Sequence, residues 1–153
     1  MTDRTFRSVD DIMAYAIRRE IEAAEGYAKI AALAATPGLR ELADDLRKQE
    51  ESHRRLLEGL TPGDLRRLGT AFVPDLQIVD ALPEEKPAAD MSLQEMLVFA
   101  AKKEAQAVAL YESLAHAAGT SDQARLFGFL AGQEREHKLR LEAEYERQVL
   151  QEN

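Results

Sequence analysis

Two Glu-x-x-His motifs are the part of this sequence whose residue types and spacing could do chemistry. The first runs from Glu50 to His53 and the second from Glu134 to His137. On a helix, side chains three residues apart share a face about one turn along, so each pair can reach one metal ion or bridge to a second. Carboxylate oxygens together with imidazole nitrogens suit iron or manganese. A metal centre is therefore the first hypothesis.

The motifs belong to an internal duplication. A lone glutamate precedes each of them, Glu20 in the first half and Glu104 in the second, and equivalent residues lie 84 positions apart. The same offset relates five further pairs: Ala23 and Ala107, Tyr27 and Tyr111, Leu46 and Leu130, Gln49 and Gln133, and Leu57 and Leu141. One lone glutamate and one Glu-x-x-His from each half form the ligand set by which a four-helix bundle holds two iron or manganese ions.

Charge favours a metal centre over a purely structural repeat. Four carboxylates inside a helical bundle would repel one another and lose hydration, and their pKa values would rise strongly. Two divalent cations would bring the sum of the charges to zero. A single Glu-x-x-His is common in a glutamate-rich helical protein. Here both copies lie within stripes of leucine. Gln49 and Gln133 recur as well and could contact the ligands from outside, but they stand one position off the ligands, so we favour solvent exposure for them.

Long helices must position these residues. The sequence predicts four of them, over about 9–35, 39–60, 92–118 and 121–150. Thr36, Pro37 and Gly38 separate the first two, with Thr36 as a cap for the second. Ser92 and Glu95 form a capping box that opens the third.

A long connection over about 61–91 joins the two helical hairpins, because Pro74, Pro83 and Pro87 forbid a continuous helix there. Short links make each hairpin antiparallel, whereas the crossover lets the second and third helices run in the same direction. The sequence therefore predicts an all-α fold. Two duplicated helical hairpins form an antiparallel four-helix bundle, as a single domain over 1–153.

Composition limits the class of protein. The 153 residues include no cysteine, which excludes disulfides, iron–sulfur clusters and thiol nucleophiles. A net charge of −8 argues against nucleic acid or anionic lipid as a partner. No apolar run approaches the ~20 residues of a membrane helix, and no N-terminal stretch has the features of a signal peptide. We expect a cytoplasmic protein that does not bind membranes.

On these residues the chain resembles the ferritin-like di-iron carboxylate superfamily, and most closely its rubrerythrin-like branch. The strongest marks are Glu20-x-x-Ala23-x-x-Gly26-Tyr27 and Glu104-x-x-Ala107-x-x-Leu110-Tyr111, each followed by its Glu-x-x-His. The resemblance covers roughly 9–60 and 91–148 and implies a ferritin-like bundle.

The resemblance also implies a role for each site residue. Two iron ions, for which manganese or zinc could substitute, would have two terminal glutamates, two bridging glutamates and one histidine each: Glu20 and Glu104, Glu50 and Glu134, and His53 and His137. Tyr27 and Tyr111 match inward tyrosines that lie beside the centre and hydrogen bond to ligand carboxylates.

Two departures from rubrerythrin are visible. Without cysteine the chain lacks the rubredoxin-type iron site, so electrons would come from an outside donor such as a rubredoxin-like protein. Ala107 stands where rubrerythrins often carry an extra glutamate, which makes the predicted site symmetric and closer to the six-ligand centre of bacterioferritin.

The implied activity is that of an oxidoreductase of oxidative-stress defence, reducing hydrogen peroxide or dioxygen at a di-iron centre. Three alternatives remain open. A ferritin-type or bacterioferritin-type ferroxidase for iron storage would need a hollow shell, and a di-iron oxygenase would need an apolar tunnel to the metals. A non-catalytic helical interaction module would need neither. The long crossover and the duplicated halves favour a homodimer, in which the hairpins could be domain-swapped.

Overall fold

The computed structural model describes residues 9–66, 87 and 90–152, and the secondary structure in these ranges is entirely helical. Its four long helices are α1 (Val9–Leu33), α2 (Pro37–Glu58), α6 (Leu93–Ala117) and α7 (Ser121–Glu152), and a short helix, α3 (Pro62–Arg66), follows α2. The all-α prediction is confirmed. Most of the predicted crossover, at 67–86 and 88–89, lies outside the described residues.

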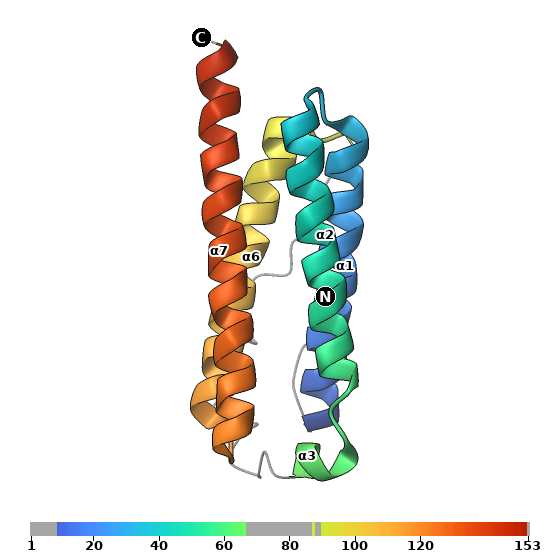
Figure 1. Cartoon of the computed structure of the whole chain (residues 1–153), viewed down its shortest axis with the longest axis vertical. Coiled ribbons are helices and arrows are strands. Elements are labelled where there is room, and N and C mark those ends of the chain that lie inside the picture. Colours follow the sequence, from blue (N-terminus) through green and yellow to red (C-terminus); the bar gives the residue numbers. More distant parts are fainter. Residues whose placement is uncertain (1–8, 67–86, 88–89, 153) are drawn as a thin grey trace.

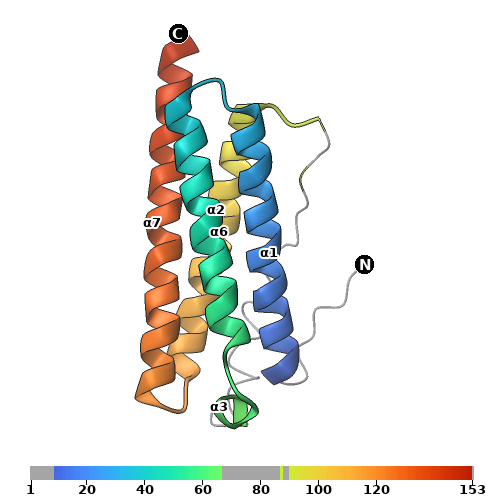
Figure 2. The ribbon, with the colours of Figure 1, turned by 45° about the vertical axis from the view of Figure 1, so that its right-hand side comes forward.

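The four long helices form a bundle of two hairpins (Figure 1). In one hairpin α1 packs against α2, and in the other α6 packs against α7. The hairpins meet where α1 lies beside α6 and α2 lies beside α7. Figures 1 and 2 show α2 and α6 running in the same direction, so every pair of neighbouring long helices is antiparallel. No helix in the described ranges combines the length and the hydrophobicity needed to span a membrane.

Helix caps determine where the hairpins turn. The Thr36 hydroxyl accepts a hydrogen bond from the backbone N–H of Leu39 at 3.2 Å, so α2 begins at Pro37, two residues before the predicted start. At the start of α6, the Ser92 hydroxyl accepts from the Glu95 N–H and the Glu95 carboxylate accepts from the Ser92 N–H, both at 3.1 Å. Each cap satisfies backbone donors that the first turn of a helix leaves unpaired.

The core consists of two apolar clusters, which leave a polar stretch between them. One gathers residues from the start of α1, the end of α2, the end of α6 and the start of α7, among them Ile12, Leu57 and Leu130. The other gathers residues from the opposite ends of the same helices, among them Leu46 and Leu141. Interiors of this kind are close-packed. The side chains between the clusters are therefore held from both ends of the bundle.

Leu130 offers a test of this packing, because it is fully buried one turn before Glu134. We expect Leu130→Ala to lower the free energy of unfolding by about 2–5 kcal/mol, through lost burial and the cavity that remains. Leu139, on the same helix and 59% exposed, supplies the control: Leu139→Ala should change stability by no more than about 0.5 kcal/mol. Urea unfolding followed by circular dichroism measures both, and equal losses would contradict the assigned core.

Candidate metal centre

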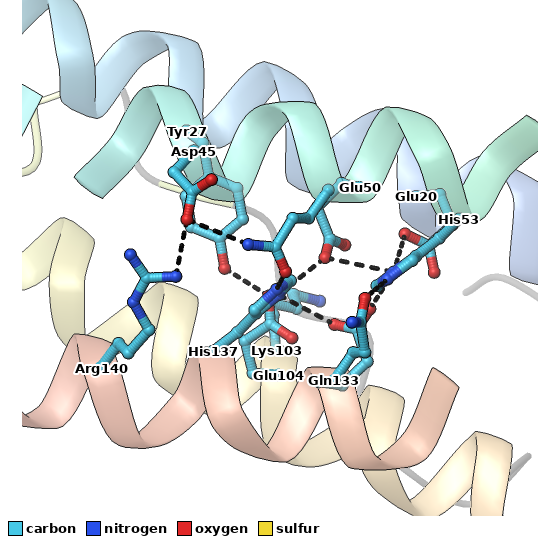
Figure 3. Close-up of polar contacts among 12 residues, drawn as sticks. Glu20, Tyr27, Asp45, Glu50, His53, Lys103, Glu104, Gln133, His137 and Arg140 are labelled. Carbon is cyan, nitrogen blue, oxygen red and sulfur yellow. Dashed lines mark hydrogen bonds and ion pairs between the residues drawn. The ribbon is translucent and has the colours of Figure 1, made fainter. Parts of the chain in front are cut away.

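The structure brings all six predicted ligand residues together midway along the bundle. Glu20 comes from α1 and Glu104 from α6, while each Glu-x-x-His comes from the helix that completes the same hairpin, α2 or α7 (Figure 3). Each of the six residues is at least 98% buried. Four helices thus place four carboxylates and two imidazoles together in the interior of the bundle.

The six residues form two overlapping groups of potential ligands. The first group is Glu20, Glu50, His53 and Glu134, and the second is Glu50, Glu104, Glu134 and His137. Within each group, one ligand atom of every residue lies within 4.8 Å of those of the others. Glu50 and Glu134 occur in both groups. They therefore lie where a carboxylate could bridge two ions, and Glu20 and Glu104 each lie beside one position only.

The contacts across the centre occur in pairs that are related by the internal repeat. His53 Nδ1 lies 2.7 Å from Glu134 Oε1, and His137 Nδ1 lies 2.8 Å from Glu50 Oε1. Each histidine therefore faces the glutamate of the opposite motif. The two imidazole rings stack with 5.8 Å between their centroids and 10° between their planes. The arrangement is close to two-fold symmetric, as the repeat predicts.

Several inward-facing atoms lack a hydrogen-bond partner in the described structure. They are Glu20 Oε2, Glu50 Oε1, Glu104 Oε2, Glu134 Oε2 and His137 Nδ1. The short approach of Glu50 to His137 does not have the geometry of a hydrogen bond. A buried polar atom left unpaired costs about 1–3 kcal/mol. Cations between these oxygens and nitrogens would satisfy all of them, so the donor set fits iron or manganese.

The buried charged groups of the centre shift the pKa values of one another. Burial raises the pKa of Glu50 and of Glu134, and repulsion from Glu104 adds to both shifts. Burial opposes the charged form of His53, but hydrogen bonds to Glu134 and Glu20 outweigh it and raise the pKa of His53 to about 10. Without metal, protons therefore supply part of the positive charge that the carboxylates require. Metal ions would have to displace those protons.

Two tyrosines fix the lone glutamates. The Tyr27 hydroxyl of α1 donates to Glu104 Oε1 on α6, and the Tyr111 hydroxyl of α6 donates to Glu20 Oε1 on α1. Burial, followed by the nearby carboxylates, raises the pKa of both tyrosines well above the usual value, so the hydroxyls stay protonated and act as donors. Each bond engages one carboxylate oxygen and leaves the other without a hydrogen-bond partner in the described structure. The resemblance implied tyrosine–carboxylate bonds of this kind.

Two glutamines contact the histidines from outside, a role that the sequence left open but did not favour. His53 Nε2 lies 2.6 Å from Gln133 Oε1, and His137 Nε2 lies 2.8 Å from Gln49 Oε1. An amide oxygen accepts from Nε2–H and so leaves the Nδ1 lone pair for a metal ion. Placing Gln49 and Gln133 in solvent was wrong because each reaches across to the other helix. Their recurrence in the repeat was the available signal.

A cavity of about 320 Å³ reaches the centre from the side, between α1 and α6. The carboxylates of Glu20 and Glu104 line it, and much of its remaining wall is apolar, including Ile30, Met96 and Phe99. Gly26 also lies on this wall, and a Cβ added there would meet no atom within 4 Å. The cavity gives a small molecule a way to the carboxylates that avoids the tightly packed α1–α2 and α6–α7 contacts.

One known family model matches part of this chain. The rubrerythrin family model matches residues 80–153, which contain α6 and α7 with Glu104 and the second Glu-x-x-His. This match is consistent with a rubrerythrin-like member of the ferritin-like superfamily. No curated protein and no solved structure matches it. The match lies on the second hairpin, but the first presents the same residue types 84 positions earlier and brings them to the same centre.

The raised pKa values predict how pH acts on this rubrerythrin-like protein without metal. A proton on His53 stabilises the fold below pH 6.5, the ordinary pKa, and this stabilisation disappears as pH rises through about 10. The raised pKa values of Glu50 and Glu134 act in the same direction, from pH 4.5 upward. We therefore expect the Tm of chelator-treated protein to fall as pH rises from about 6.5 to 10.

Thermal melts by circular dichroism measure this dependence. The growing negative charge of the whole chain also lowers stability at high pH, so His53→Gln is the control and should show a shallower fall in Tm. A Tm that rises across this interval, or an equal slope in His53→Gln, would contradict the assigned proton.

Proposed function

We propose that this protein binds two iron ions and reduces hydrogen peroxide, or dioxygen, with electrons from an external donor. The proposed ligands are the six buried residues Glu20, Glu50, His53, Glu104, Glu134 and His137. The observation that carries the proposal is the set of buried ligand atoms that face one space without hydrogen-bond partners among the described residues. A bound pair of ferrous ions supplies the two electrons that, with two protons, convert one peroxide molecule to two of water.

The chain's own residues prepare the centre for these ions. Glu50 and Glu134 belong to both ligand groups and would bridge. Tyr27 and Tyr111 hold the terminal glutamates in place before metal arrives, which reduces the reorganisation that binding requires. The cavity between α1 and α6 would admit peroxide beside Glu20 and Glu104. Its largely apolar wall limits the water that accompanies the oxidant.

The electron donor must come from outside the chain, because the sequence has no cysteine for a rubredoxin-type iron site. A small rubredoxin-like protein is the proposed donor, and a homodimer is the proposed assembly. A ferroxidase that stores iron would use the same ligands inside a hollow shell. Sedimentation of the purified protein separates a dimer from such a shell.

Anaerobic titration with Fe(II) tests the centre. We expect two ions per chain, and oxidation of the loaded protein by about one equivalent of peroxide per two irons, followed by absorption spectroscopy. Glu50→Gln should reduce metal affinity at both positions, because Glu50 belongs to both groups. Glu51→Gln is the matched control, since Glu51 is a half-exposed neighbour that pairs with Arg47 at 3.0 Å. Full binding by Glu50→Gln would exclude the proposed ligand set.

The cavity favours a second candidate, an oxygenase that acts on a small organic molecule. Peroxide needs far less than 320 Å³, and an apolar wall that ends at the carboxylates suits an organic substrate.

Gly26→Phe distinguishes the two functions, because the new ring would occupy open space in this wall. If peroxide reduction is the function, the rate of peroxide-driven iron oxidation, measured by stopped-flow absorption, should fall by less than about threefold. Gly26→Ala, which adds little volume, is the control. Peroxide oxidation that requires an added apolar compound, and that is lost in Gly26→Phe alone, would favour the oxygenase.

A further inference from the structure

The near two-fold symmetry of the centre ends at the outer edge of its histidines. Beyond His137, Gln49 Nε2 donates to Asp45 Oδ2 at 3.0 Å, and Arg140 Nη1 donates to the same oxygen at 2.8 Å (Figure 3). The residues related to Asp45 and Arg140 by the repeat are Phe129 and Leu56. The hydrogen-bonded pair Asp45 and Arg140 near His137 is thus replaced near His53 by two apolar side chains.

The geometry beside His53 shows what this replacement changes. The Phe129 ring meets the His53 imidazole edge-on, with centroids 6.5 Å apart and planes at 78°. Phe129 and Leu56 are 51% and 42% exposed. Neither can accept a hydrogen bond, so neither can do for Gln133 what Asp45 does for Gln49.

The acceptor at Asp45 determines the orientation of the Gln49 amide. A carboxylate accepts hydrogen bonds only, so Gln49 must direct its NH₂ group at Asp45 and its oxygen at His137. That oxygen in turn requires His137 to carry its proton on Nε2, which leaves Nδ1 as a lone pair facing the centre. Arg140 holds Asp45 in place and keeps it charged, since the pKa of Asp45 is lowered chiefly by that hydrogen bond. The hydrogen bonds from Arg140 through Asp45 and Gln49 therefore hold His137 in the tautomer whose Nδ1 can bind metal.

We propose that Asp45 and Arg140 are positioning residues that make the two metal positions unequal, so that the position at His137 binds first and more tightly. At the position of His53, no carboxylate among the described residues holds Gln133 as Asp45 holds Gln49, so the orientation of the Gln133 amide is not fixed in this way. This inference rests on the proposed metal centre and adds an order of filling to it. Direct hydrogen-bond partners of a histidine ligand change metal affinity by about 10–100-fold, and Asp45 acts on His137 through such a partner, Gln49.

Mn(II) is the probe for the test. Anaerobic calorimetric titration of the metal-free protein should give two dissociation constants that differ by at least about tenfold. Crystals grown with one equivalent of Mn(II) should show anomalous scattering beside His137 and little beside His53. Asp45→Ala should weaken the tighter constant by about tenfold or more and bring the two together. Asp44→Ala is the matched control, because Asp44 is the preceding residue and its nearest basic partner, Arg47, is 3.9 Å away.

The reverse experiment introduces an equivalent carboxylate–arginine pair beside Gln133. The double variant Phe129→Asp with Leu56→Arg rebuilds the pair on the other side at two exposed positions, and it should tighten the weaker constant while leaving the stronger unchanged.

The outcomes separate the two levels of the proposal. Absence of Mn(II) binding would reject the metal centre itself. Two equal constants in the wild-type protein, first occupancy at His53, or no effect of Asp45→Ala would reject the inequality and leave the metal centre standing.

Discussion

The structure depends on the burial of four carboxylates with two imidazoles between two apolar clusters. Removing such groups from water is unfavourable, and their attraction to cations offsets this only when the geometry is good. The leucines at either end supply that geometry, because a close-packed interior leaves the ligand side chains few alternative rotamers. Metal binding and folding should consequently be linked: the free energy of binding the proposed ions would stabilise the folded bundle, and protons would substitute for the ions only in part.

The duplication explains why the important contacts occur in crosswise pairs. Tyr27 reaches the lone glutamate of the second hairpin, and Tyr111 reaches that of the first. Neither hairpin holds a complete centre, so the centre is also the principal polar interface between them. Away from it, Arg19 Nη2 donates to the Lys103 carbonyl at 2.7 Å and joins α1 to α6. A ligand that binds the centre would therefore hold the two hairpins together.

The sequence predicts the six ligand residues, but it does not predict the contacts around them, and the reasons are physical. The ligands follow from helical spacing, since residues three and seven apart share a face, and the Ser92 capping box follows from local chemistry. The contacts of Gln49 and Gln133 cannot be predicted in this way, because spacing along one helix does not show which residue of another helix a long side chain reaches. The cavity cannot be predicted from the sequence either, because its width depends on how closely α1 approaches α6. The repeat predicts a symmetric site, and only the side chains at Asp45 and Phe129 reveal where that symmetry ends.

The same charge argument accounts for Ala107. A glutamate there would add a fifth carboxylate to the wall of the cavity, where Ala107 now lies 8% exposed. Five carboxylates would exceed the charge of two divalent ions and would favour the more highly charged ferric pair. With alanine, the ligand set would be balanced for the proposed pair of divalent ions, and the volume beside the carboxylates stays open. Charge balance therefore limits the centre to four carboxylates, while positions outside that balance, such as Asp45 and Phe129, are free to make the two halves differ.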